Sequence, residues 1–140
     1  MKRAAVLGAS GYTGRELHRL LSRHSALELA VFASAREGSA PEPAELPSEP
    51  GIDALDWQRV AQCDGAFLCT PHGTSAPLAR RCLELGLRVV DLSADFRLPD
   101  AALYQRHYEH AHAAPELLPQ AVNGLTERAR PALREGRKRR

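Results

Sequence analysis

The chain has 140 residues, of which 44% are hydrophobic and 26% charged, a composition typical of one globular domain. No stretch reaches the roughly 18 consecutive apolar residues of a transmembrane helix, and the start leads into a glycine turn rather than a signal-peptide apolar region, so we expect a cytoplasmic protein with no membrane partner. The net charge is only +2 and much of the basic excess lies at 137–140, which excludes nucleic acid as an expected partner.

Strands and helices alternate from the start of the chain. An apolar strand at 3–8 is followed by a helix at 14–24 with leucines at helical spacing, and then by a second strand at 28–34. These elements predict a βαβ unit whose right-handed crossover places two parallel strands side by side. The next segment, 38–51, holds four prolines between two glycines, which predicts a surface loop.

The alternation continues with a short helix, a buried strand, a longer helix and a fourth strand, predicted at 53–62, 65–70, 74–86 and 87–93. Leu55, Trp57 and Val60 are the core candidates of the short helix, and Gly86 can end the longer helix in the left-handed conformation. We therefore expect an α/β fold: a Rossmann-like, doubly wound, mostly parallel sheet with helices on both faces.

The last third of the sequence has a different pattern. A helix is predicted at 99–108, because a proline can open it, and a polar, histidine-rich loop follows at 109–120. A last short strand is predicted at 121–126. Thr126 is expected to cap a final arginine-rich helix, which Pro131 interrupts or begins.

A glycine turn joins the first strand to the first helix. Gly8 permits a tight turn, Gly11 allows close approach to a pyrophosphate, and Gly14 lets the helix pack against the strand. The free backbone N–H groups and the positive helix end suit a phosphate, and the intervening side chains can add contacts: Ser10, Tyr12 and Thr13. The alternative is a connection that binds nothing, but the strand before the turn and the helix after it favour a ligand.

The end of the second strand indicates which dinucleotide binds. An NAD site usually places an acid there for the ribose 2′-OH, whereas this sequence has Ser34 and Arg36. A charge-assisted hydrogen bond of about 1.5–3 kcal/mol would give NADP a preference of roughly one to two decades. We therefore expect NADP as the cofactor, the alternative being that Arg36 is only an exposed loop charge.

Four stretches together resemble the N-terminal part of the N-acetyl-gamma-glutamyl-phosphate reductase family: "GASGYTGREL" at 8–17, "TPHGTSAPLA" at 70–79, "VVDLSADFRLPDAALYQRHY" at 89–108 and "PELLPQAVNGLTE" at 115–127. The resemblance implies NADPH-dependent conversion of an acyl phosphate to a semialdehyde in arginine biosynthesis, through a cysteine thioester, in a homo-oligomer. A related aminoadipyl-phosphate reductase of lysine biosynthesis shares these motifs, so the acyl substrate stays open.

The resemblance also implies roles for individual residues. Those matching cofactor contacts are Gly8, Ser10, Gly11, Tyr12, Thr13, Gly14, Ser34, Arg36, Pro71, His72, Gly73 and Ser75. On the substrate side it indicates Ser93 and Arg97, beside Asp95. Arg97 is either a clamp for a phosphate or carboxylate or the partner of Asp95 or Asp100 in a structural salt bridge. His72 is expected to bond to backbone in a tight turn, without a chemical role.

The family pattern is incomplete in this sequence. The resemblance implies a nucleophilic cysteine in an "NPGCYPT"-like segment, and nothing similar occurs, so we assign no catalytic residue. We expect a truncated homologue with an NADP-binding domain at 1–127 and a disordered tail at 128–140; the alternative is a remnant that binds NADP without catalysis. A short-chain dehydrogenase is nearly excluded, because lysine occurs only at positions 2 and 138 and cannot form a Tyr-x-x-x-Lys pair.

Two further groups of residues resemble a reactive site and a metal site. Cys69 precedes His72 by three residues, but its place in an apolar strand favours a buried, inert thiol. His107, His110 and His112 resemble a metal cluster, yet an exposed loop explains them more simply. With three cysteines and no C-x-x-C pair, we expect no metal site and no disulfide framework.

Overall fold

The structure, a computed structural model, describes residues 1–44 and 50–136. Its elements are β1 (Lys2–Leu7), α1 (Tyr12–Leu21), β2 (Leu27–Ala33), α2 (Trp57–Val60), β3 (Gly65–Leu68), α3 (Ser75–Glu84), β4 (Arg88–Asp91), α4 (Ala101–Tyr108), the 3-10 helix η1 (Pro115–Gln120) and α5 (Thr126–Gly136). Within these ranges no helix is long and apolar enough to cross a membrane.

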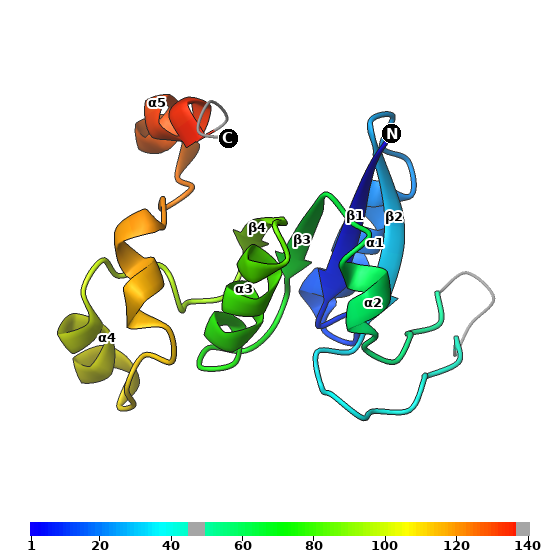
Figure 1. Cartoon of the computed structure of the whole chain (residues 1–140), viewed down its shortest axis with the longest axis horizontal. Coiled ribbons are helices and arrows are strands. Elements are labelled where there is room, and N and C mark those ends of the chain that lie inside the picture. Colours follow the sequence, from blue (N-terminus) through cyan, green and yellow to red (C-terminus); the bar gives the residue numbers. More distant parts are fainter. Residues whose placement is uncertain (45–49, 137–140) are drawn as a thin grey trace.

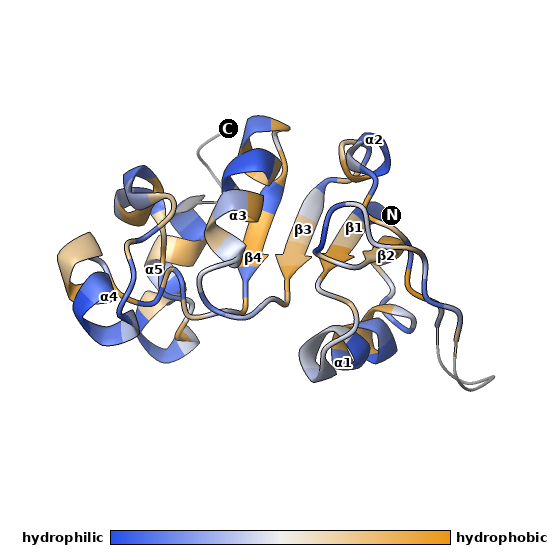
Figure 2. Cartoon of the chain, turned by 90° about the horizontal axis from the view of Figure 1, so that it is seen from below, coloured by the Kyte–Doolittle hydropathy of each residue, from blue (hydrophilic) through white to orange (hydrophobic). Residues whose placement is uncertain are grey.

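The four strands form one parallel sheet in the order β2-β1-β3-β4. Helix α1 lies against one face of this sheet, while α2 and α3 cover the other (Figure 2). The predicted doubly wound α/β fold is therefore confirmed. Parallel pairing places the carboxyl ends of all four strands at one edge of the sheet, where such folds bind their ligands.

The alternation of side chains along β1 divides the core into two layers. Ala5 and Leu7 face α2 and α3, and they pack with Leu68, Val60 and Cys82. On the opposite face, the layer under α1 contains Val6, Ala9, Leu21, Phe32 and Ile52. Trp57 and Leu55 are partly buried against the first layer, so the three core candidates of the short helix are confirmed.

The short helix is shorter than predicted at its amino end. Asp53 pairs with the outer edge of β2, since its N–H donates to the Phe32 carbonyl and its own carbonyl accepts from Ser34 N–H. Asp56 then caps α2 by accepting hydrogen bonds from the N–H groups of Gln58 and Arg59. A carboxylate at the N-cap is worth about 1 kcal/mol, so the helix begins after it.

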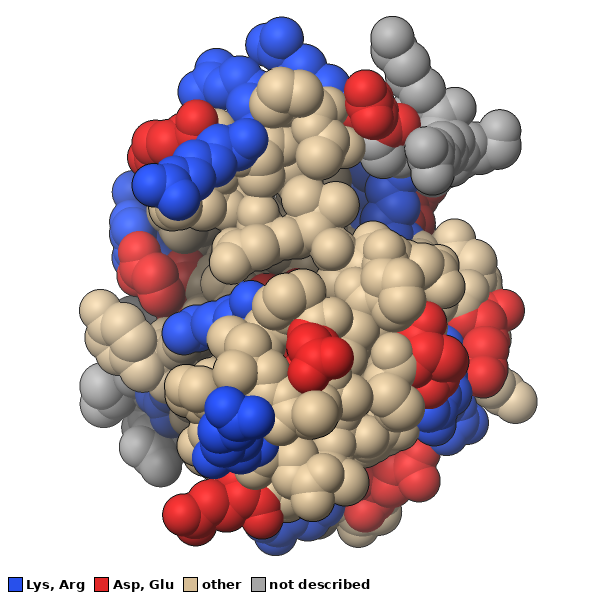
Figure 3. Space-filling model, turned by 90° about the vertical axis from the view of Figure 1, so that its left-hand side faces the viewer, with Lys and Arg blue, Asp and Glu red and all other residues tan. Residues whose placement is uncertain are grey.

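The region after β4 lies beside the sheet and does not extend it (Figure 1). The strand predicted at 121–126 is wrong: this segment has no strand pairing in the described part of the chain, and Val122 and Leu125 are 45% and 54% exposed. The final helix is confirmed as α5, with Pro131 inside it, so the segment expected as a tail is helical as far as Gly136. Arginine, alanine and glutamate favour helix there. On the face of the molecule that lies at the left of Figure 1, acidic and basic side chains are interspersed (Figure 3).

The polar loop predicted at 109–120 is only partly correct. It contains the helix η1, and it is not exposed throughout, because His112 is 7% exposed and His110 is half-buried. The His112 ring lies edge-on to Phe96 and Tyr104, with centroids 5.3 and 4.7 Å away. Polar composition did not predict burial, because aromatic packing and backbone hydrogen bonds satisfy these rings.

Residues 45–49 of the predicted surface loop, and 137–140 of the predicted tail, lie outside the described residues. The described ends of that loop are joined by an isolated antiparallel bridge between Glu42 and Ile52, whose backbone groups exchange hydrogen bonds of 2.8 and 2.7 Å. This bridge holds the two described ends of the loop together.

Candidate functional site

The glycine turn after β1 requires glycine at two positions for packing. Gly8 has φ +89°, and a Cβ added there would lie 2.6 Å from the Cys69 carbonyl oxygen at the end of β3. A Cβ on Gly14 would lie 2.7 Å from the Gly8 carbonyl oxygen. These contacts agree with the tight turn and the helix packing expected at the two positions.

Gly11 has a different environment. It is exposed, its φ is −80°, and a Cβ there would meet nothing closer than 3.8 Å. The space above it is therefore open, and the absence of a side chain leaves room for a group to approach the backbone. Around it the side chains of Ser10, Tyr12 and Thr13 are exposed, that of Tyr12 by 86%.

The N-terminus of α1 is uncapped. Gly11 offers no side chain, the first turn has no acidic residue, and no described residue accepts a hydrogen bond from the N–H groups of Tyr12, Thr13 or Gly14. An uncapped helix end carries partial positive charge and free donors, which is the arrangement that binds phosphates.

The neighbouring helix α3 is capped from within the chain. Asp95, which is fully buried, accepts hydrogen bonds from the N–H groups of Gly73, Ser75 and Ala76 at 2.6, 3.0 and 2.9 Å. The Tyr104 hydroxyl donates to the same carboxylate at 2.9 Å. Burial, and then the hydrogen bond to Asp95 and the charge of that carboxylate, raise the pKa of Tyr104 well above its usual value. The anion at the start of α3 is therefore a side chain of the protein.

Two predicted site residues belong to the support of this cap. The Ser75 hydroxyl, fully buried, donates to Asp91 Oδ1 at 2.5 Å. Ser93 donates from its hydroxyl to Asp91 Oδ2 at 2.8 Å and accepts from Asp95 N–H at 3.0 Å. Both hydroxyls are engaged within the protein, so they fix the loop after β4 against α3.

Arg97 extends from that loop into solvent. Its Nε donates to the Ser93 carbonyl at 3.0 Å, and the side chain is otherwise exposed. No salt bridge to Asp95 or Asp100 is formed among the described residues. Asp100 instead caps α4 by accepting from Leu103 N–H at 2.8 Å. The structural alternative for Arg97 is therefore not observed.

His72 lies on an aromatic cluster formed by α4 and the loop after it. Its ring centroid is 5.4 Å from that of Tyr108 and 5.9 Å from that of His110. The backbone hydrogen bond expected for its side chain is not formed in the described part of the chain. Pro71 and His72 are exposed, and a Cβ on Gly73 would lie 2.9 Å from His110 Nε2. Of the three histidines that resemble a metal cluster in the sequence, His107, in α4, is exposed, while His110 and His112 are not.

The end of β2 meets the glycine turn directly. The N–H groups of Gly8 and Ala9 donate to the Ala33 carbonyl at 3.0 and 3.1 Å. Ser34 follows, buried, and its hydroxyl oxygen accepts from Arg36 N–H at 3.2 Å. The exposed guanidinium of Arg36 has no partner among the described residues. The predicted contacts of the turn and of this strand end thus lie at one place.

The sequence reasoning missed Thr70. Its side chain is 8% exposed, and its Oγ1 is buried without a hydrogen-bond partner in the described structure. Its Cγ2 would lie 3.1 Å from a Cβ on Gly8, so the orphaned hydroxyl belongs to a residue beside the glycine turn. A buried polar atom without a partner is rare and points to a group that binds there. Its position as the last residue of the third predicted strand, at the carboxyl edge of the sheet, was the available signal.

None of the three cysteines is an activated thiol. Burial, with a smaller effect of the Asp91 charge, raises the pKa of Cys69 to about 11. Burial raises the pKa of Cys82 to about 11 and also raises that of Cys63. Cys69 forms no hydrogen bond with His72 in the described structure. Among these residues, no three His, Cys, Asp or Glu side chains come together to hold a metal ion.

Comparison with known proteins agrees with this geometry. Residues 3–135 match the family model described as "Semialdehyde dehydrogenase, NAD binding domain". Curated relatives named N-acetyl-gamma-glutamyl-phosphate reductase include one from Azotobacter vinelandii, 43% identical over 98% of this chain, and one from Neisseria gonorrhoeae, 42% identical over 96%. These matches cover 42% and 40% of the relatives, so the chain spans about two fifths of their length.

Solved structures show the same fold at lower identity. An aspartate semialdehyde dehydrogenase with NADP from Candida albicans has a TM-score of 0.57 at 23% identity, covering 72% of this chain and 32% of that one. Aspartate semialdehyde dehydrogenase II from Vibrio cholerae has a TM-score of 0.50 at 20% identity, covering 71% of this chain and 33% of that one.

Proposed function

Because the chain belongs to the semialdehyde dehydrogenase NAD-binding domain family, we propose that it is the NADP-binding part of an N-acetyl-gamma-glutamyl-phosphate reductase. That activity reduces an acyl phosphate to a semialdehyde with a hydride from NADPH, and it releases inorganic phosphate and NADP. The observation that carries the proposal is the uncapped N-terminus of α1, placed beside an open glycine at the carboxyl edge of a parallel sheet.

The residues present fit a dinucleotide. The free N–H groups of Tyr12, Thr13 and Gly14 and the open space over Gly11 suit the diphosphate. The orphaned Thr70 hydroxyl supplies a hydrogen-bonding group on the other side of the turn. When bound, the reduced nicotinamide supplies a hydride. The contribution of this chain is to bind and orient.

NADP is proposed over NAD because of the groups that follow β2. The guanidinium of Arg36 is exposed and has no partner among the described residues, and it follows Ser34 by two positions. An arginine there accommodates a 2′-phosphate, whereas an NAD site places an acid in contact with the ribose. The distant relative solved with NADP supports this only as far as the shared fold.

Arg97 is proposed to bind the phosphate or carboxylate of the acyl substrate. Its Nε donates to the Ser93 carbonyl, and its two terminal nitrogens have no partner in the described part of the chain, which suits a bidentate contact. Ser93 positions Arg97 through that carbonyl. Pro71 and His72 lie exposed at the same edge and are proposed to line the nicotinamide side of the site.

A second candidate function is nucleotide binding without turnover by these 140 residues. It is favoured by the state of the cysteines, because the acyl transfer needs a thiolate and the pKa values of all three thiols are raised. Both candidates predict that the chain binds NADPH, and turnover of an acyl phosphate by this chain alone would contradict the second.

The test is a titration of the purified chain with NADPH, followed by nicotinamide fluorescence, with acyl-phosphate-dependent oxidation measured in the same sample. The decisive variant is Gly11→Asp. Aspartate is a favourable N-cap and the backbone at Gly11 tolerates a side chain, so the variant should fold at least as stably as the parent. Its carboxylate would occupy the seat of the diphosphate, so the affinity for NADPH should fall more than tenfold.

Gly124→Asp is the matched control, since this exposed glycine has no atom within 4 Å of an added Cβ and lies outside the site. It should bind NADPH as the parent does. An unchanged affinity for NADPH in Gly11→Asp would refute the proposed diphosphate-binding site at the start of α1. Binding without oxidation agrees with both candidates, and turnover by this chain would refute the second.

A further inference from the structure

Three side chains from different elements meet beyond the end of β2. Glu37 Oε1 accepts a hydrogen bond from Trp57 Nε1 of α2 and another from Arg81 NH1 of α3, each at 2.7 Å. The Arg81 guanidinium also lies over the Trp57 ring, 4.1 Å from its centroid. We call Glu37, Trp57 and Arg81 the brace.

The brace adds a second attachment to the turn that carries Arg36. The first attachment is the hydrogen bond from Ser34 N–H to the Asp53 carbonyl, 3.1 Å long. Arg36 lies between the two, immediately before Glu37. A turn fixed at both ends holds its backbone in one place, which lowers the entropy lost when a ligand binds.

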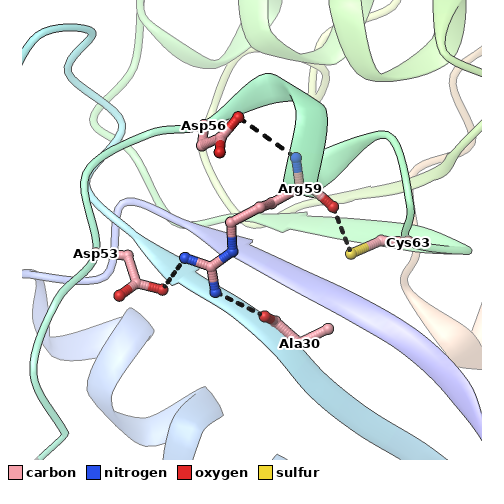
Figure 4. Close-up of polar contacts among 5 residues, drawn as sticks. All are labelled: Ala30, Asp53, Asp56, Arg59 and Cys63. Carbon is pink, nitrogen blue, oxygen red and sulfur yellow. Dashed lines mark hydrogen bonds and ion pairs between the residues drawn. The ribbon is translucent and has the colours of Figure 1, made fainter.

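The brace also engages an acid that would otherwise favour a different ligand. Two carboxylates lie close to the carboxyl end of β2, those of Glu37 and Asp53. Asp53 Oδ2 is paired with Arg59 NH1 at 2.8 Å, and Arg59 also donates to the Ala30 carbonyl (Figure 4). Glu37 is paired with Arg81. Each acid therefore has an arginine partner, while Arg36 has none among the described residues.

The net charge of the side chains around Arg36 favours the 2′-phosphate of NADP. Arg36, Glu37 and Arg81 together carry one positive charge, whereas without Arg81 they would be neutral. An unpaired carboxylate here would accept a hydrogen bond from a ribose 2′-OH and repel a 2′-phosphate.

We propose that the brace sets the nucleotide preference of the site: it withdraws Glu37 from the ribose and fixes the turn of Arg36 for a 2′-phosphate. The inference rests on the proposed function. Glu37, Trp57 and Arg81 are positioning residues, which act through Arg36.

The test measures the dissociation constants of NADPH and NADH, which differ only in the 2′-phosphate, for the full chain and three variants. Arg81→Met removes the charge and both contacts of Arg81. Glu37→Gln keeps the acceptor oxygen and removes the acid. Arg80→Met is the matched control on the same helix, because Arg80 pairs with Glu116 at 2.7 Å and has similar exposure. Trp57, the sole tryptophan, reports the brace by its fluorescence without nucleotide.

The NADPH preference of Arg81→Met should fall about three- to tenfold, the size expected for a solvent-screened charge, and its Trp57 emission should change. Glu37→Gln should keep or increase the preference, and Arg80→Met should leave it within twofold.

An unchanged preference in Arg81→Met, or an equal loss in Glu37→Gln, would overturn the inference. So would a loss of both affinities in the same proportion, since that is the effect of a general structural role. A parent chain that binds neither nucleotide refutes the proposed function itself, and one that prefers NADH refutes the brace as a selector of NADP.

Discussion

Replacing Asp95 by asparagine should destabilise the protein through the start of α3. The carboxylate accepts four hydrogen bonds, three of them from backbone N–H groups. Asparagine has one acceptor oxygen, and its NH2 group must face at least one of these donors. The least costly orientation leaves Gly73 N–H without an acceptor, because the Tyr104 hydroxyl can rotate to accept from the new amide and donate to His110.

The size of the effect follows from two losses. An unpaired buried donor costs about 1–3 kcal/mol, and losing a negative charge at a partly buried helix N-terminus costs about 1 kcal/mol more. The free energy of unfolding should fall by about 2–4 kcal/mol in Asp95→Asn. With a urea m-value of about 2 kcal/mol/M, the unfolding midpoint should fall by about 1–2 M.

Urea unfolding followed by Trp57 fluorescence measures this shift. Asp100→Asn is the control, because Asp100 is an exposed N-cap of α4 with one hydrogen bond and asparagine caps equally well. It should stay within about 0.5 kcal/mol of the parent. Equal midpoints for the two variants would refute the assignment of Asp95 as the buried cap of α3.

Three further predictions concern the backbone at two glycines and the reactivity of the Cys69 thiol. Gly14→Ala should lower the free energy of unfolding by more than about 2 kcal/mol, since its Cβ would lie within 3 Å of backbone atoms of Gly8 and Ala9. A loss below about 1 kcal/mol in urea unfolding would contradict this. Gly86→Ala should cost only about 1 kcal/mol in the same assay, because φ is +80° but the space is empty. The pKa of Cys69, raised to about 11, keeps the thiol protonated at neutral pH, so iodoacetamide should modify it slowly at pH 8 and much faster above pH 10. Peptide mass spectrometry measures the rate of Cys69 alkylation, with the urea-denatured chain as the control. Rapid alkylation of Cys69 in the folded chain at pH 8 would contradict the raised pKa.

Local sequence was sufficient for the elements that make up the sheet. Each of these elements is specified by its own residues: β1 and β3 by the apolar runs around Leu7 and Leu68, and α1 by the leucine spacing before Leu21. The predicted bounds of all three were confirmed within a few positions. Gly8 was also predictable, because a strand followed by a turn and a helix needs a residue that tolerates positive φ.

The remaining features depend on contacts between distant residues. Asp95 caps a helix that begins 20 positions earlier, so no window of sequence around either segment contains the interaction. His112 belongs to a polar segment, but its Nε2 lies 2.9 Å from the Asp95 carbonyl oxygen and its ring packs on Tyr104, which removes the cost of burying it. For Thr70 the sequence offers only its position at the end of a predicted strand, and the structure adds a buried hydroxyl without a partner among the described residues.

The Asp95 carboxylate has a consequence for the way a ligand can lie on the protein. Two helix ends of similar electrostatic character would give a diphosphate two competing seats and two opposite orientations along the edge. Because Asp95 fills one of them, the start of α1 is the one of these two helix ends that remains open to a diphosphate. In the proposed binding mode, an internal side chain thus keeps the diphosphate at the start of α1 without touching the ligand.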